Sequence, residues 1–256
     1  MSFWRPERSS ETANHFTFNA TPTACVGASD QQFLMGGVAM AAAIEAAIEV
    51  TGKPLLWATI QFVSGGALGD AVEIEVEHLG GGRNVAQVGA SLSVGDRRLQ
   101  YMSAALGGRA GYADQQFVQM PDVPPPEDCL PMPAHAMGNP ENLVSRFERR
   151  AVFECSETGV EHLWIRPTFK TEMSASLLSI VSDFFLGAHV LSRAGTSLDN
   201  TLRIHALEPT NWILTSTHMA GTSNGTMFGT QHQFTQDGAL LSTSSQTGLL
   251  PRRASK

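Results

Sequence analysis

The same order of predicted elements occurs twice in this chain of 256 residues, and that repeat restricts the possible folds more than any other feature. In the first half, the alanine-rich segment 35–52 predicts a helix, and four strand-like runs follow it between residues 55 and 107. In the second half, the apolar segment 173–192 predicts a helix, and four more strand-like runs follow between residues 201 and 250. The sequence therefore predicts two units of similar structure.

The spacing between the units is nearly constant. The predicted helices end near Val50 and Leu191, and the last predicted strands end near Leu106 and Leu250. Both offsets are about 140 residues, as expected for a duplicated helix and four-stranded meander.

A proline-rich segment separates the two units. Six of the 13 prolines fall within residues 121–133, and proline disfavours helices and interior strands. This composition predicts an exposed linker. We expect an N-terminal domain over residues 1–110, a linker over 111–145 and a C-terminal domain over 146–256.

The small side chains of the first predicted helix indicate how the sheet lies around it. A sheet can curl closely around a helix only where the helix side chains are small, and six alanines fill this segment: Ala39, Ala41, Ala42, Ala43, Ala46 and Ala47. The sequence predicts an α+β fold of two hotdog units, a double hotdog in which each antiparallel sheet wraps around a central helix. We expect the two sheets to join into one continuous sheet with approximate two-fold symmetry, because this pairs edge strands that would otherwise be open.

Charge and cysteine usage exclude several classes of protein. The net charge of −7 and the lack of a Lys/Arg block argue against nucleic acid or an anionic membrane as a partner. The polar N-terminus predicts no secretory signal, and the longest apolar stretch is too interrupted to span a bilayer. Cys25, Cys129 and Cys155 are far apart, which predicts reduced thiols in a cytoplasmic protein. No metal-ligand spacing occurs, so we predict neither a metal nor a cofactor.

Asp183 is the only formally charged residue in the apolar segment 173–192, which we expect to be helical throughout. A carboxylate costs several kcal/mol to bury without a partner. One interpretation is structural, with Asp183 at a helix kink and bonded to a local hydroxyl such as that of Ser179. The other is a functional acid.

Several short motifs resemble those of the type II acyl-CoA thioesterase family (TesB-like), whose members fuse two hotdog units in one chain. The motifs are, in order, "FLMGG", "GGGRNVAQVGASLSVGDRRLQYMSAALG", "SIVSDFFLG", "TSLDNTLRIH", "NWIL" and "FTQDGALLSTSSQTGLL". The resemblance implies an enzyme of fatty acid metabolism that hydrolyses acyl-CoA without a cofactor. It also implies a homodimer or a higher homo-oligomer.

The resemblance implies that three side chains hold a hydrolytic water. Asp183 matches the family's helix aspartate, Gln246 matches its glutamine on the last strand, and Ser197 stands where the family commonly has threonine. A carboxylate can accept a proton from the attacking water, while a hydroxyl and an amide can orient it. Gly36 and Gly37 at the start of the first helix could let the substrate approach backbone N–H groups that stabilise an oxyanion.

Other interpretations of the same residues stay open at this stage. Taken alone, Gln246 could face solvent, because the serines two and four residues before it share its face of a strand. Arg83, Arg97 and Arg98 lie beside predicted turns and could reach the phosphates of CoA, or could be ordinary solvated arginines.

Two other functions compete with thioester hydrolysis. A hotdog hydratase or dehydratase resembling the MaoC type carries Asp-x4-His, whereas Asp183–His189 and Asp199–His205 are both one residue too long. A non-catalytic acyl-CoA-binding protein would not need an aspartate in an apolar segment. Release of free thiol from acyl-CoA separates hydrolysis from both alternatives.

Overall fold

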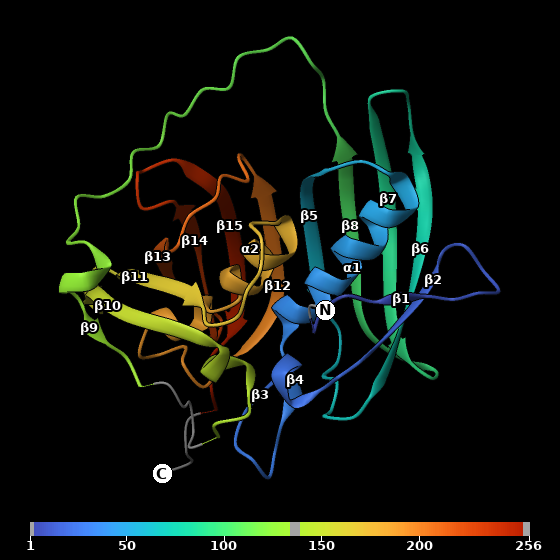
Figure 1. The fold of residues 1–256 in the computed structure, drawn as a ribbon. Helices are drawn as coiled ribbons and strands as arrows, with labels where there is room; N and C mark the ends of the chain where they lie inside the picture. The colour runs from blue at the N-terminus through green and yellow to red at the C-terminus, as the bar shows by residue number, and fades with distance from the viewer. Residues whose placement is uncertain (1–2, 134–138, 253–256) are drawn as a thin grey trace.

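The computed structural model describes residues 3–133 and 139–252, which form one large curved antiparallel sheet with two helices packed against its inner side (Figure 1). The sheet has 13 strands in the order β1-β2-β6-β7-β8-β5-β12-β15-β14-β13-β11-β10-β9. The α-helices are α1 (Gly36–Thr51) and α2 (Ala175–Ser182), and the short 3-10 helices are η1 (Pro22–Ala24), η2 (Pro126–Asp128), η4 (Leu143–Arg146) and η5 (Phe185–Ala188).

The strands divide between the two halves of the chain. The N-terminal half contributes β1 (Glu7–Arg8), β2 (His15–Asn19), β5 (Leu55–Phe62), β6 (Ala71–Gly81), β7 (Val85–Val94) and β8 (Arg97–Gly107). The C-terminal half contributes β9 (Leu130–Pro131), β10 (Phe147–Cys155), β11 (Val160–Pro167), β12 (Thr196–Ile204), β13 (Ile213–Ser223), β14 (Thr226–Phe234) and β15 (Leu240–Leu249). A separate small sheet pairs β3 (Cys25–Val26) with β4 (Phe33–Leu34).

The halves meet where β5 pairs with β12. Thr59 lies opposite Thr201, and their hydroxyl oxygens are 2.9 Å apart. On either side of this pair, Ala58 lies opposite Leu202 and Ile60 opposite Asn200. From this junction outward, the order β5-β8-β7-β6 mirrors the order β12-β15-β14-β13. The predicted continuous antiparallel sheet is therefore confirmed.

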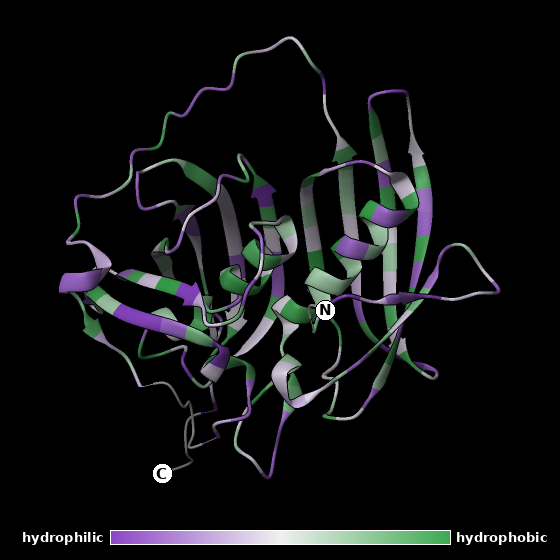
Figure 2. Ribbon diagram, viewed as in Figure 1, coloured by the Kyte–Doolittle hydropathy of each residue, from purple (hydrophilic) through white to green (hydrophobic). Residues whose placement is uncertain are grey.

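Helix α1 forms because alanine dominates its sequence, and it ends at Gly52 in the left-handed conformation, with φ of 64°. All six of its predicted packing alanines are fully buried. Their small side chains let the inner faces of β5, β6, β7 and β8 lie close to the helix axis (Figure 1). Figure 2 shows the resulting pattern, with alternating hydropathy along these strands.

The second helix is shorter than its apolar sequence predicts. We expected it to continue to about Leu191, but α2 ends at Ser182. The N–H groups of Asp183 and Phe184 donate to carbonyls three residues earlier, which tightens the last turn, and η5 follows. Leu191 lies well beyond this turn and is 54% exposed. Asp183 therefore lies directly after the helix and not in its middle.

Part of the proline-rich linker packs on the sheet, which corrects the expectation of a wholly exposed segment. The indole N–H of Trp164 donates to the carbonyl of Pro124 at 2.9 Å. Cys129 from the linker is buried in a small cluster with Trp164, Trp212 and Phe234. Strand β9 then extends the sheet edge, where proline is tolerated. Residues 134–138 of the predicted linker lie outside the described residues.

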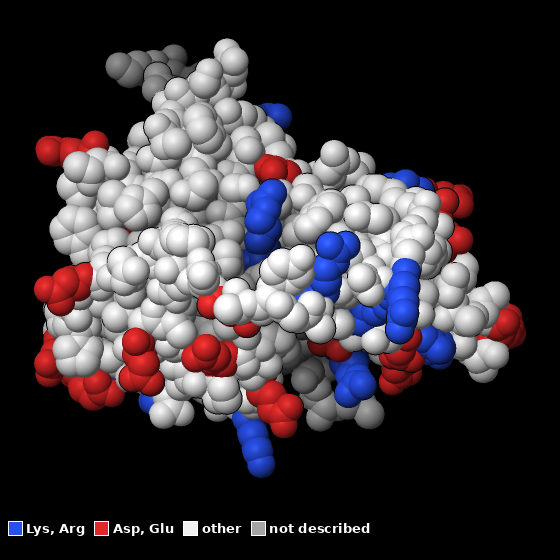
Figure 3. All heavy atoms as spheres, turned by 90° about the horizontal axis from the view of Figure 1, so that it is seen from above, with Lys and Arg blue, Asp and Glu red and all other residues white. Residues whose placement is uncertain are grey.

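Charged side chains of both signs are distributed over the face seen from above (Figure 3). No helix in the described ranges is long and apolar enough to cross a membrane. Cys25, Cys129 and Cys155 are free thiols, and Cys25 and Cys129 are buried.

Candidate active site

Asp183 receives hydrogen bonds from both halves of the chain. Its Oδ2 accepts the backbone N–H of Gly37 at 2.6 Å, and its Oδ1 accepts the side-chain amide of Gln246 at 2.7 Å. Gly37 is the second residue of α1, where helix N–H groups have no partner within the helix and favour a negative charge. The end of α2, the start of α1 and the last strand therefore meet at one carboxylate.

Gln246 joins this carboxylate to a hydroxyl. Its Nε2 also donates to Ser197 Oγ at 3.0 Å, so both amide hydrogens are used. Gln246 is 2% exposed, and its Oε1 is buried without a hydrogen-bond partner. The solvent-facing interpretation of Gln246 is therefore wrong: this face of β15 turns inward, toward α2.

A β-bulge sets the position of Ser197 on β12. The register against β15 shifts between Ser197 and Asp199, so one extra residue lies in this strand. Beside the bulge, the carboxylate of Asp199 on β12 accepts the backbone N–H of Thr247 on β15 at 2.8 Å. The structure thus brings Asp183, Gln246 and Ser197 together, as the sequence motifs predicted.

The two glycines at the start of α1 also lie at this site, but for a different reason from the one expected. A Cβ added to Gly37 would lie 2.6 Å from Asp183 Cβ, and one added to Gly36 would lie 2.5 Å from the ring of Phe62. The space beside both glycines is therefore filled by protein. Moreover, the N–H of Gly37 is bonded to Asp183, which corrects its expected role as an oxyanion donor. No hydrogen bond among the described residues uses the N–H of Gly36.

The environment of Asp183 changes its proton affinity. Burial raises the pKa of Asp183 from its ordinary 3.8 to about 6, because the charged form loses hydration. The hydrogen bonds from Gly37 and Gln246 favour the carboxylate and oppose part of this shift. A carboxylate with a pKa close to neutral pH is suited to take up and release a proton.

The alternative role of Asp183, at a helix kink held by a local hydroxyl, is wrong. The hydroxyl of Ser179 donates instead to the carbonyls of Gly37 and Ser176, at 3.2 and 2.9 Å. Ser179 therefore holds α2 against α1, while the partners of Asp183 are distant in the chain.

Sequence reasoning missed two residues that support the site. Asn200 is completely buried, and its Nδ2 donates to Ser182 Oγ at 2.9 Å, which ties β12 to the last turn of α2. Phe62 lies against Gly36 at the start of α1. Asn200 lies directly before the strand predicted from Thr201, so the strand pattern did not single it out, and nothing in the sequence indicated Phe62.

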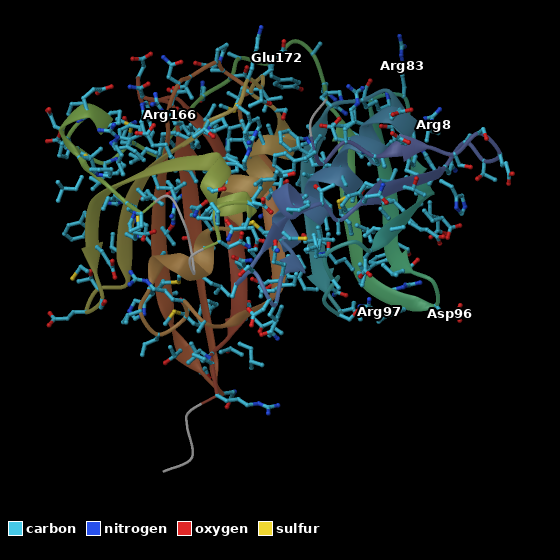
Figure 4. All side chains as sticks on the ribbon, turned by 60° about the horizontal axis from the view of Figure 1, so that its bottom comes forward. Arg8, Arg83, Asp96, Arg97, Arg166 and Glu172 are labelled. Carbon is cyan, nitrogen blue, oxygen red and sulfur yellow. The ribbon has the colours of Figure 1, made fainter. Side chains whose placement is uncertain are left out.

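The arginines considered for CoA binding do not form one cluster. Arg83 and Arg97 lie at opposite ends of the N-terminal half (Figure 4). Arg97 is bonded to the carboxylate of Asp70 at 3.2 Å and to the carbonyl of Gly65. Within the described ranges, no group of three or more His, Cys, Asp or Glu side chains is arranged to hold a metal ion.

An acid bonded to an amide that also bonds a hydroxyl, between two helices on a continuous antiparallel sheet, defines a site suited to hydrolysis. The family described as the acyl-CoA thioesterase N-terminal domain matches residues 27–107, and the acyl-CoA thioesterase C-terminal domain matches residues 126–250. The chain therefore belongs to the acyl-CoA thioesterase family, and it is a thioesterase.

Solved structures share this fold. A proposed thioesterase from Novosphingobium aromaticivorans DSM 12444 is 30% identical, with a TM-score of 0.90 over 98% of this chain and 100% of the other. A tesB protein of Mycobacterium avium subspecies paratuberculosis is 19% identical, with a TM-score of 0.80 over 98% and 97%. A hotdog-fold protein of unknown function from Alicyclobacillus acidocaldarius is 18% identical, with a TM-score of 0.85 over 98% and 97%. No curated protein sequence matches the chain.

Proposed function

We propose that this double-hotdog protein hydrolyses acyl-CoA by activating a water molecule with Asp183, Gln246 and Ser197. The observation that carries the proposal is the chain of hydrogen bonds from Asp183 Oδ1 through Gln246 Nε2 to Ser197 Oγ. Each of these groups keeps a free site for water. The carboxylate has unused lone pairs, Gln246 Oε1 is an unpartnered acceptor, and the serine hydroxyl can still donate.

In the proposed reaction, Asp183 takes a proton from water as the water oxygen attacks the thioester carbon. The tetrahedral intermediate then collapses, the C–S bond breaks, and the proton passes from Asp183 to the departing thiolate. The products are a free acid and CoA. The N–H of Gly36, at the start of α1, is the proposed donor to the oxyanion, where the helix N-terminus favours negative charge.

The first test is Asp183→Asn, assayed by release of thiol from acyl-CoA. Turnover should fall by roughly a hundredfold or more, the scale of losing general-base chemistry. The folded pKa of Asp183 lies above its unfolded value, so its ionisation costs stability as pH rises from about 4 to about 6. The variant should therefore melt at the same temperature as the wild type or higher at pH 8.

Asp96→Asn, in an exposed turn, is the matched control and should change neither property. An Asp183→Asn protein that is less stable but equally fast would refute the catalytic role.

We also propose that the chain forms a homodimer or a higher homo-oligomer through the outer face of its sheet. Leu198, Phe228 and Leu249, on the neighbouring strands β12, β14 and β15, are 40%, 47% and 47% exposed. Exposed apolar groups on adjacent strands favour burial against another surface. Light scattering should give at least twice the mass of one chain, and a monomer mass at micromolar concentration would contradict this.

A further inference from the structure

Two buried polar side chains beside the proposed catalytic residues each have an atom without a partner. Asn200 is 0% exposed and Ser244 is 3% exposed, yet Asn200 Oδ1 and Ser244 Oγ have no hydrogen-bond partner in the structure. Buried polar atoms in folded proteins are nearly always bonded, so each exception requires an explanation, and a ligand or an ordered water is one. These two atoms are additional to Gln246 Oε1, to which the proposed mechanism assigns the hydrolytic water.

Strand register places both side chains next to Gln246. Asn200 lies directly opposite Gln246 across β12 and β15, where facing Cβ atoms are about 5 Å apart. Ser244 precedes Gln246 by two residues on β15, so it points to the same side about 7 Å away. A group bound by Asn200 and Ser244 would therefore lie a few bonds from a thioester carbonyl at the proposed water site.

The hydrogen bonds already made define what these atoms can recognise. The amide of Asn200 donates to Ser182, which leaves Oδ1 as an acceptor. The hydroxyl of Ser244 can both donate and accept. Neither side chain is charged, and the nearby carboxylate of Asp183 disfavours a second anion. The complementary ligand group is a neutral hydroxyl.

Four further polar side chains of this inner face, on β13, β14 and β15, bond to one another or to the backbone. Gln231 donates to Thr217 at 3.0 Å, and Gln233 donates to Gln231 and to the carbonyl of Leu178 at 3.0 and 3.1 Å. Ser242 completes the network by donating to Gln233 at 3.0 Å. A long alkyl chain would gain little from contact with these four side chains, because hydrogen-bonded polar groups offer little apolar surface.

We propose, on the basis of the proposed hydrolysis at Asp183, that Asn200 and Ser244 form an acyl subsite for a hydroxyl group. The substrate class is a short acyl-CoA with a hydroxyl on the second to fourth carbon of the acyl chain. The hydroxyl donates to Asn200 Oδ1 and exchanges a hydrogen bond with Ser244 Oγ. An unsubstituted acyl chain leaves Asn200 Oδ1 and Ser244 Oγ unpaired, so the site favours the hydroxylated substrate over the unsubstituted one.

The test compares kcat/KM of the purified full chain for 3-hydroxybutyryl-CoA, butyryl-CoA and decanoyl-CoA. The hydroxylated substrate should exceed butyryl-CoA by at least about tenfold, and decanoyl-CoA should be the poorest of the three. Ser244→Ala should bring the ratio of hydroxybutyryl to butyryl close to one. Asn200→Ala provides a second, independent variant with the same expected loss of preference.

Ser245→Ala is the matched control, because its side chain points to the opposite face of the same strand, and it should keep the wild-type ratio. A wild-type ratio near one, or a preference for decanoyl-CoA, would mean that Asn200 and Ser244 bind only water and would overturn the inference. Hydrolysis of none of the three substrates would instead overturn the proposed function, and the inference with it.

Discussion

At several matching positions on their inner faces, the two halves of the sheet differ in chemistry. Thr59 and Thr201 face each other at the junction, so residues at equal offsets from them occupy matching positions. Ala58 thus corresponds to Asn200. Ala58 pairs with Ala104 on the next strand, and Asn200 pairs with Gln246. Two residues earlier on these strands, Met102 corresponds to Ser244. One strand further out, Ala90 corresponds to Gln231, and Leu92 corresponds to Gln233. The N-terminal positions are apolar and packed, whereas their C-terminal counterparts are polar and buried.

Comparing the two halves shows which inner-face residues the fold needs and which it does not. The N-terminal half forms the same arrangement of strands and helix with alanine, valine and leucine inside, so the fold does not depend on polar groups at these positions. The polar residues of the C-terminal half therefore have another reason, which the proposed water and hydroxyl sites supply.

Helices α1 and α2 contact each other at two ends, and these ends also differ in their polar groups. At one end, Asp183 after α2 accepts the N–H of Gly37, the second residue of α1. At the other end, Glu45 on α1 accepts the hydroxyl of Ser176, the second residue of α2, at 2.5 Å. Both ends have an acid, but only Asp183 is bonded to an amide that also bonds a second hydroxyl. The polar residues of β12 and β15 therefore distinguish the Asp183 end of the helix pair from the Glu45 end.

The largest combined effect on rate and stability is expected from breaking the close contact at Gly37. A methyl group in Gly37→Ala would lie 2.6 Å from Asp183 Cβ and 2.8 Å from the carbonyl oxygen of Ser179, so α2 must move. A displacement of about 1 Å at a catalytic group can cost about a hundredfold in rate, and overpacking costs about 1–3 kcal/mol. Turnover and thermal unfolding of the same preparation measure both effects.

The matched change at the other end of the helix pair is Ser176→Ala. It removes one hydrogen bond, worth about 1 kcal/mol, and should leave turnover within about twofold of wild type. Equal losses of activity in Gly37→Ala and Ser176→Ala would contradict the asymmetry between the two ends.

A smaller effect is expected from Gln246→Ala, which gives β15 the residue found at position 104 of the N-terminal half. Turnover should fall by about tenfold, less than for the loss of the base, because the amide orients water without taking its proton. The variant also removes a hydrogen bond that favours the carboxylate, so the pKa of Asp183 should rise further.

The acidic limb of the rate profile of Gln246→Ala should accordingly move to higher pH. Gln61→Ala, an exposed glutamine on β5, is the control and should leave both the rate and the limb unchanged. An unshifted limb in Gln246→Ala would show that the amide does not act on Asp183.

Local pattern predicted much of the fold. The alanines of α1 and the alternating residues of β6 identified these elements, because period and side-chain size depend only on neighbouring residues. The early end of α2 could not be predicted in this way, since residues 173–192 are apolar on both sides of Asp183, and the bonds that hold Asp183 at the helix end come from the distant residues Gly37 and Gln246. The packing of the linker residues Cys129 and Pro124 on the sheet similarly depends on Trp164, which lies in another element.

The candidate site was predictable in its residues but not in its connections. The motifs identified Asp183, Ser197 and Gln246, whereas the bond from Gly37 to Asp183 joins residues 146 positions apart. No sequence pattern indicated that this N–H would hold the acid. The proposed roles of Asn200 and Ser244 likewise depend on strand register, which appears only when β12 and β15 are paired.

The most direct test of the account is the pH dependence of kcat/KM for acyl-CoA hydrolysis in the wild type and in Asp183→Asn. Because burial raises the pKa of Asp183 to about 6, the wild-type rate should rise about tenfold per pH unit below pH 6 and level off above pH 7. Asp183→Asn should be slow throughout and lack this limb. A wild-type profile that is flat between pH 5 and 8, or an Asp183→Asn profile that keeps the same limb, would contradict Asp183 as the base.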